Sequence, residues 1–211
     1  MQSPEKGLFT QAVMVLLSRV PSLDEIKQAL LLACPIEARS TFGGSNWCEG
    51  GPLLVLPFAP EKNGYLLVDT IERPWPDALG DSEDDLDVPP AWAAGHFGPL
   101  SFGGCLNQAA LQSWKWKAGR RIQEKHVAFL RIRLTYLLGV LNPDKAHPLP
   151  LAKAVSPLEE LQFLTQVSGA LLTLRGALCL FYPAGEALRD AAFVEERLHL
   201  HRSGGPPPID V

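Results

Sequence analysis

SPLEELQFLTQVSGALLTLRGALCLFY, residues 156–182, carries the clearest structural signal in this chain. Ser156, Pro157 and Glu159 have the order of a capping serine, a proline in the first helical turn and a glutamate that can bond back to the cap. A stripe of apolar residues at helical spacing follows: Leu161, Leu164, Val167, Leu171 and Leu174. Gly176 predicts the end of the helix, and the apolar run 177–182 predicts a strand. A helix and a strand this apolar are expected to form the core.

Two strand–helix–strand units are predicted, one over residues 12–56 and one over 127–182. Each helix opens with Ser-x-x-Glu, at Ser22 in the first unit and at Ser156 in the second. Asn63-Gly64 between two apolar runs predicts a hairpin. The expected fold is α+β: a two-layer sandwich, ferredoxin-like or related, with a mixed sheet and helices mainly on one face. We expect a single domain over residues 8–201 and a disordered, proline-rich tail over 202–211.

Three further elements are expected, and one of them carries charge. Helices are predicted over residues 106–117 and 186–199, and a strand over 127–134. Arg131 and Arg133 alternate with apolar residues in the second half of that strand. This alternation predicts that one face of the strand contacts water there.

Composition excludes several classes of protein. The formal net charge of −4 disfavours nucleic-acid binding, because such proteins need a basic face to displace counterions from phosphate. No apolar run approaches the length of about 20 residues that spans a membrane. The N-terminus lacks the pattern of a secretory signal, and the four cysteines form no framework of pairs, so a reducing cytoplasm is the expected location.

Cys105 is the best candidate for a nucleophile. It follows two glycines at the expected start of a helix, where the positive helix end would lower the pKa of a thiol. His96 or His126 could supply the base. The segment around Cys105 matches no cysteine-hydrolase signature, however, and packing within a glycine-rich loop is the alternative. The sequence shows no phosphate-binding loop and no metal-ligand spacing, so no cofactor and no metal are expected.

Residues 114–121 form the one basic patch, Trp-Lys-Trp-Lys-Ala-Gly-Arg-Arg. Tryptophans between lysines suit single-stranded nucleic acid. A helix would place Trp114 and Trp116 on different faces, so we expect core packing with basic residues at the helix C-terminus.

A rigid acidic segment is the predicted partner-binding surface. Prolines stiffen both of its flanks, and five carboxylates would attract a basic target over long range. The flanking tryptophans are large enough to act as binding anchors. The alternative is a solvated loop above a core that holds both tryptophans. The predicted binding residues are Trp75, Asp81, Glu83, Asp84, Asp85, Asp87 and Trp92.

Three features together resemble an uncharacterised bacterial domain family. They are Trp114 at the end of a mid-chain helix, His126-Val127-Ala128-Phe129 opening a strand, and a capped helix followed by residues 176–183, Gly-Ala-Leu-Cys-Leu-Phe-Tyr-Pro. The resemblance covers roughly residues 10–195 and consists mostly of hydrophobic pattern. The family is similar to immunity proteins encoded beside polymorphic, contact-dependent or type VI secretion toxins, which typically bind a cognate effector through acidic loops.

Two functions of different classes follow. The resemblance implies a non-enzymatic immunity protein whose partner is a cognate effector toxin. The composition adds that neither nucleic acid nor a membrane is expected as a partner. The alternative is a cysteine-dependent hydrolase or transferase that uses Cys105 with a histidine.

Overall fold

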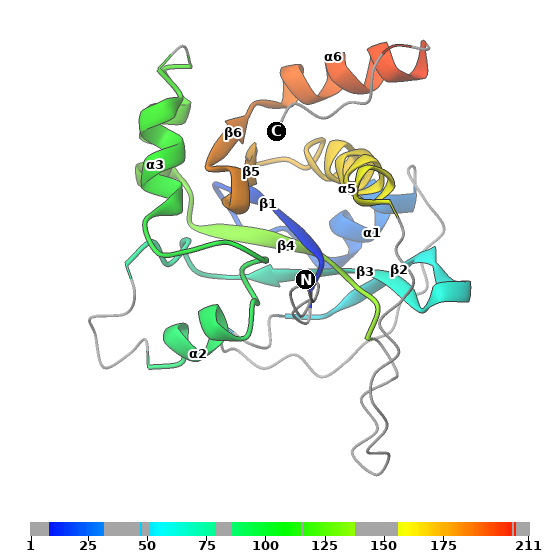
Figure 1. Cartoon of the computed structure of the whole chain (residues 1–211). Helices are drawn as coiled ribbons and strands as arrows, with labels where there is room; N and C mark the ends of the chain where they lie inside the picture. The colour runs from blue at the N-terminus through cyan, green and yellow to red at the C-terminus, as the bar shows by residue number, and fades with distance from the viewer. Residues whose placement is uncertain are drawn as a thin grey trace, which may run out of the picture.

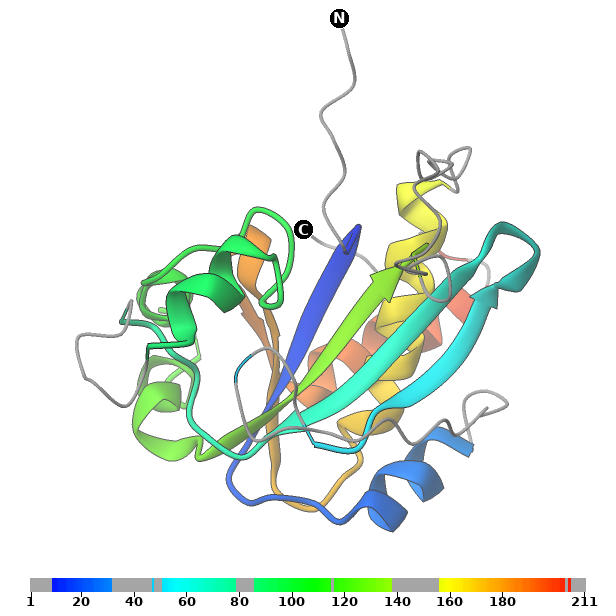
Figure 2. The ribbon, with the colours of Figure 1, turned by 90° about the horizontal axis from the view of Figure 1, so that it is seen from below.

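A six-stranded sheet forms the centre of the molecule, with helices packed on both of its faces (Figures 1 and 2). The computed structural model describes residues 9–31, 47, 51–78, 86–114, 116–137, 156–203 and 205. The strands are β1 Gln11–Leu17, β2 Leu54–Ala59, β3 Gly64–Ile71, β4 Ala128–Thr135, β5 Ala177–Tyr182 and β6 Ala187–Arg189. The helices are α1 Leu23–Leu31, α2 Val88–Ala93, α3 Cys105–Gln112, α4 Ile122–Lys125, α5 Pro157–Leu171 and α6 Ala191–Arg202. Short 3-10 turns are η1 Pro60–Lys62, η3 Gly119–Arg121 and η4 Pro183–Gly185.

The strand order is β2-β3-β4-β1-β5-β6, and each of these neighbouring pairs is antiparallel. The α+β sandwich expected from the sequence is confirmed, but helices cover both faces of the sheet rather than mainly one, and the sheet is antiparallel rather than mixed. The unit β4–α5–β5 explains the difference. Strands β4 and β5 run in the same direction, yet β1 lies between them and pairs antiparallel with both. A strand–helix–strand pattern therefore does not require the two strands to be neighbours.

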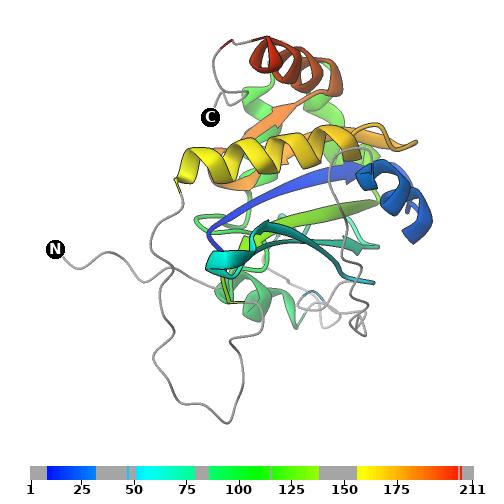
Figure 3. The ribbon, with the colours of Figure 1, turned by 90° about the vertical axis from the view of Figure 1, so that its right-hand side faces the viewer.

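The longer helices α1, α5 and α6 pack against one face of the sheet, with α6 stacked on α5 (Figure 3). Leu164, Val167 and Leu171 of α5 are buried there, as the apolar stripe predicts. Leu180 of β5 belongs to the same core. Helix α5 ends at Leu171, five residues before the end predicted at Gly176, so Leu174 lies beyond the helix. Gly176 has a φ of +91° in the turn that leads from this helix into β5.

The two predicted capping boxes differ in outcome. At α1 the box forms: Ser22 N donates to Glu25 Oε2 at 2.8 Å, and Glu25 N donates to Ser22 Oγ at 3.2 Å. At α5, Ser156 occupies the cap position, but its side chain makes no capping hydrogen bond. The predicted hairpin is present between β2 and β3, where Asn63 adopts the left-handed conformation after η1.

The second face of the sheet is covered by the short helices α2, α3 and α4 and by the loops between them. Its core is rich in aromatic side chains, among them Trp47, Trp75, Phe97, Phe129 and Phe181. The helix predicted over residues 106–117 ends at Gln112, and residues 187–189 form β6 before the last helix begins at Ala191. Of the predicted tail, Arg202 ends α6, while residues 204 and 206–211 lie outside the described residues.

Candidate functional site

Trp75, predicted as a binding anchor, lies in the aromatic core of the second face. Only 4% of its surface is exposed, and its ring centroid lies 5.0 Å from Phe181 and 5.3 Å from Phe129 in edge-to-face contacts. Trp92 is half-buried and packs on Trp75 at 5.5 Å and on Phe97 at 4.4 Å. Both tryptophans therefore belong to the core, as the alternative interpretation of this segment expects.

The acidic segment between these tryptophans lies mostly outside the described residues, including Asp81, Glu83, Asp84 and Asp85. Leu86 and Asp87 are described. Asp87 is partly exposed, and its Oδ2 accepts a hydrogen bond from Trp47 N at 3.0 Å. This carboxylate therefore holds a buried residue in place, which is a structural role. The role of the segment in partner binding stays a prediction.

Cys105 is the first residue of α3 and is fully buried. Burial raises the pKa of its thiol to about 12, and this effect outweighs the helix end that was expected to lower it. His126 is also buried: its Nε2 accepts a hydrogen bond from Trp75 N at 2.9 Å, and its Nδ1 donates to the Ile122 carbonyl at 2.9 Å. Both ring nitrogens are thus occupied by backbone groups. An activated cysteine has a lowered thiol pKa and a nearby base that can accept its proton. Cys105 and His126 do not have these properties.

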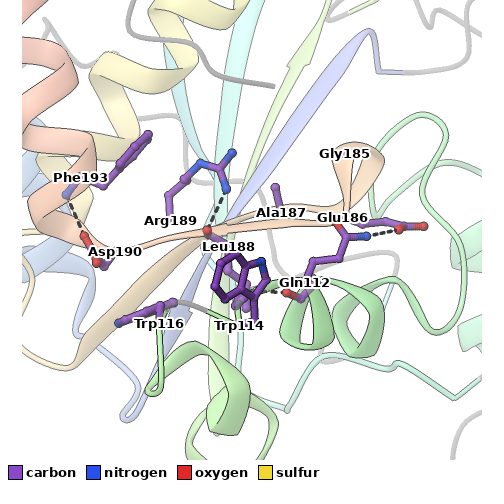
Figure 4. Close-up of a pocket in the computed structure, with 12 residues that line it drawn as sticks. Gln112, Trp114, Trp116, Gly185, Glu186, Ala187, Leu188, Arg189, Asp190 and Phe193 are labelled. Atoms are coloured by element: carbon purple, nitrogen blue, oxygen red, sulfur yellow. Dashed lines mark hydrogen bonds between the residues drawn. The ribbon is translucent and has the colours of Figure 1, made fainter.

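An open pocket lies between the end of α3, strand β6 and the start of α6 (Figure 4). Its volume is about 580 Å³. Helix α3 ends beside it because Ser113 leaves the helical conformation, with a φ of −79° and a ψ of 40°. The chain then turns, so that Trp114 and Trp116 both line the pocket. The predicted longer helix is wrong, and with it the prediction that these two tryptophans point to different faces.

The two tryptophans differ in exposure. Trp114 is 63% exposed, which contradicts the core packing expected for it. Trp116 is partly buried, and its ring lies close to Gly119: a Cβ at that glycine would stand 2.2 Å from a ring atom. Any larger residue at position 119 would therefore displace this ring. The aromatic–basic cluster of residues 114–121 could have indicated this pocket. The prediction of a helix extending to residue 117 prevented that inference.

Charged side chains of β6 and its neighbours complete the pocket. Glu186 Oε2 accepts a hydrogen bond from Gln112 Nε2 at 2.8 Å, on one side of the pocket in Figure 4. Asp190 caps α6, accepting from Phe193 N at 2.7 Å. The guanidinium of Arg189 lies 5.3 Å from the centre of the Phe193 ring and donates to the Leu188 carbonyl at 3.1 Å. The pocket thus combines aromatic walls with two carboxylates and one guanidinium.

A buried ionic cluster on the second face was missed by sequence reasoning. Arg131 and Arg133 of β4 both bond to Asp69 of β3, and Arg131 also donates to the Trp47 carbonyl. Nδ1 of His96 accepts from Arg133 Nη1 at 2.9 Å. Both arginines are almost fully buried, so the prediction of a water-exposed face for this half of β4 is wrong.

Neither a metal site nor a membrane span is found in the part of the chain that the structure describes. No three His, Cys, Asp or Glu residues among those described are grouped so that they could hold a metal ion. No described helix is both long enough and apolar enough to cross a bilayer.

Comparisons with family models, with curated proteins and with solved structures found no match to this chain. Its function is therefore argued from the geometry described above and from the resemblance in its sequence.

Proposed function

We propose that this protein is a non-enzymatic binding protein, and that it acts as an immunity protein that neutralises a bacterial effector toxin. The observation that supports this most strongly is the contrast between two residues at opposite ends of α3. The Cys105 thiol is fully buried, whereas the Trp114 side chain is 63% exposed on the rim of an open pocket. A reactive thiol needs access to substrate. A tryptophan that anchors a complex must instead be exposed until the partner covers it.

The resemblance to immunity-like proteins supplies the class of partner. Such proteins typically cover the basic active site of an effector with acidic loops. The run of five carboxylates between Asp81 and Asp87 and the net charge of −4 suit that role. Effectors of polymorphic or type VI secretion systems are accordingly the proposed partners.

Cysteine-dependent catalysis has less support. Its nucleophile would be a thiol whose pKa is raised by burial, and His126 already bonds two backbone groups. Deprotonating such a thiol near neutral pH would be unfavourable.

The test is co-expression with each secreted toxin that a neighbouring gene encodes. We expect one toxin to lose its effect on growth, and the purified pair to form a stable complex in size-exclusion chromatography. Cys105→Ser is expected to retain the protection. The proposal fails if no neighbouring toxin is bound or neutralised. It also fails if a correctly folded Cys105→Ser variant, checked by circular dichroism, loses the protection.

A further inference from the structure

The pocket between α3, β6 and α6 has the features of a preformed binding site. Its volume of about 580 Å³ lies within the range of about 300–1,000 Å³ that is usual for ligand pockets. Trp116 is partly buried and packs closely against Gly119, so one aromatic wall is already present before a ligand arrives. Trp114 stands exposed beside it and would bury a large surface when covered.

The charges of the pocket select the kind of ligand. The lining of the pocket includes two carboxylates, Glu186 and Asp190, and one guanidinium, that of Arg189. Arg189 is engaged at the Phe193 ring and at the Leu188 carbonyl. Each carboxylate is held by one hydrogen bond, from Gln112 or from Phe193 N, and a carboxylate can accept several more. Both acids are half-buried, where a cation is attracted more strongly than at a fully solvated site.

We propose that this pocket receives a lysine or arginine side chain of a protein partner, with the cation against the tryptophans and near one of the two carboxylates, which lie at opposite ends of β6. Tryptophan is the best aromatic partner for a cation, and carboxylates supply the charge-assisted hydrogen bonds. This assignment rests on the proposed binding function and adds to it the chemistry that the partner must present.

Addition of a partner strand to the edge of the sheet is a poorer fit to the same place. Strand β6 has three residues, and the Arg189 side chain donates to the carbonyl of Leu188 within it. Very short edge strands and charged edge side chains are features by which proteins resist strand addition. The pocket is therefore assigned to a side chain, inserted from a partner surface.

The test uses four blocked tripeptides, acetyl-Gly-Xaa-Gly-amide, with arginine, lysine, norleucine or glutamate at the centre. Binding is followed by nuclear magnetic resonance of the tryptophan indole N–H groups, assigned with single-tryptophan substitutions. We expect the signals of Trp114 and Trp116 to shift with arginine and lysine at millimolar concentrations. Affinity for these two should exceed that for norleucine about five- to twenty-fold, since the neutral side chain lacks the cation–π and ionic contacts.

Matched variants identify the groups responsible. Glu186→Gln with Asp190→Asn keeps side-chain oxygens that can accept the bonds from Gln112 and Phe193, and should remove the preference for a cation. Trp114→Ala should abolish the shifts, whereas Leu111→Ala should leave them unchanged. Leu111, in the last turn of α3, has the same 63% exposure as Trp114 but does not line the pocket. The assignment is overturned if norleucine binds as well as arginine, if glutamate binds better, or if the double variant keeps the cation preference.

The two proposals can fail separately. If a toxin partner is neutralised equally well by the Trp114→Ala variant, the protein is a binding protein whose partner does not use this pocket. If the cationic tripeptides bind but no neighbouring toxin is neutralised, the pocket stands and the immunity function is rejected.

Discussion

Asp69 is the residue around which the charges on the second face of the sheet are arranged. It lies in β3, and the arginines that it binds, Arg131 and Arg133, lie in the adjacent strand β4. Burial alone would raise the pKa of Asp69, but the two guanidinium groups outweigh burial and lower it. The sequence of β4 taken alone indicates a water-exposed face, because the partner carboxylate is 62 positions away from Arg131 along the chain.

Asp69→Asn is expected to lower the free energy of unfolding by about 3–5 kcal/mol, because it leaves two buried arginines without their anion. Urea unfolding at neutral pH measures the change. The matched control is Glu124→Gln, which breaks the exposed ion pair with Arg121 and should cost about 1 kcal/mol or less. Equal effects of the two substitutions would show that the buried cluster does not stabilise the fold.

His96 is expected to make the protein less stable in mild acid. Burial, followed by the nearby Arg133 and Arg131, lowers the pKa of His96 to about 4 in the folded state. The unfolded value is about 6.5, so the unfolded chain binds more protons between these two values and stability falls as the pH drops through this window. His96→Asn should reduce this loss when unfolding is compared between about pH 7 and pH 5. Some loss should remain, because burial also lowers the pKa of His126. An unchanged pH dependence in the variant would exclude His96 as a cause.

At the scale of single elements, the sequence predicts the helices and strands that depend on local pattern. It does not predict features formed by residues that lie far apart along the chain. The apolar stripe of α5 and the run that forms β5 are local signals, and both elements are confirmed, although α5 ends at Leu171 and not at Gly176. The end of α3 is different. Local pattern continues the helix to Lys117, but Ser113 leaves the helical conformation and the helix ends at Gln112. The pocket could not be predicted because β6 and α6, which form its other walls, begin more than 70 residues later.

Truncation of the α5 core tests the importance of this helix. Leu164→Ala, and likewise Leu180→Ala in β5, should destabilise the protein by about 2–5 kcal/mol, since both side chains are fully buried. Leu158→Ala in the same helix is the control, because Leu158 is 46% exposed and should contribute far less. Chemical denaturation compares the three variants. If Leu164→Ala and Leu158→Ala gave equal stabilities, α5 would not be packed as described.

The loop before α3 is positioned by a close contact between Gly98 and β1. Gly95 and Gly98 both have positive φ, so alanine at either position should cost about 1–2 kcal/mol of backbone strain. Only at Gly98 would the new Cβ also meet a neighbour, Ala12 Cβ, at 2.8 Å. Gly98→Ala should therefore destabilise the protein by about 1–3 kcal/mol more than Gly95→Ala. Thermal unfolding of the two variants checks this order, and the reverse order would contradict the contact.

At the scale of the whole molecule, charge and exposed aromatic surface are unevenly distributed. The chain carries a net charge of −4, with five acids concentrated between positions 81 and 87. The open pocket is lined by other parts of the sequence, from Ala109 to Trp116 and from Gly185 to Phe193. We propose that the acidic segment accelerates the approach of a basic partner, while the pocket forms a short-range contact that slows its release. Long-range attraction acts mainly on association rates, and buried anchors act mainly on dissociation.

These two roles predict different kinetic effects for two sets of substitutions. Replacing Asp81, Asp84 and Asp85 with asparagine should slow association with the toxin partner and flatten its dependence on salt, because screening weakens only the long-range attraction. Asp87 is left unchanged, since its carboxylate accepts the bond from Trp47 N. Trp114→Ala should instead increase the dissociation rate and leave the salt dependence as it was. Stopped-flow association at low and moderate salt separates the two effects. Unchanged association in the triple variant at both salt concentrations would remove the acidic segment from the interface.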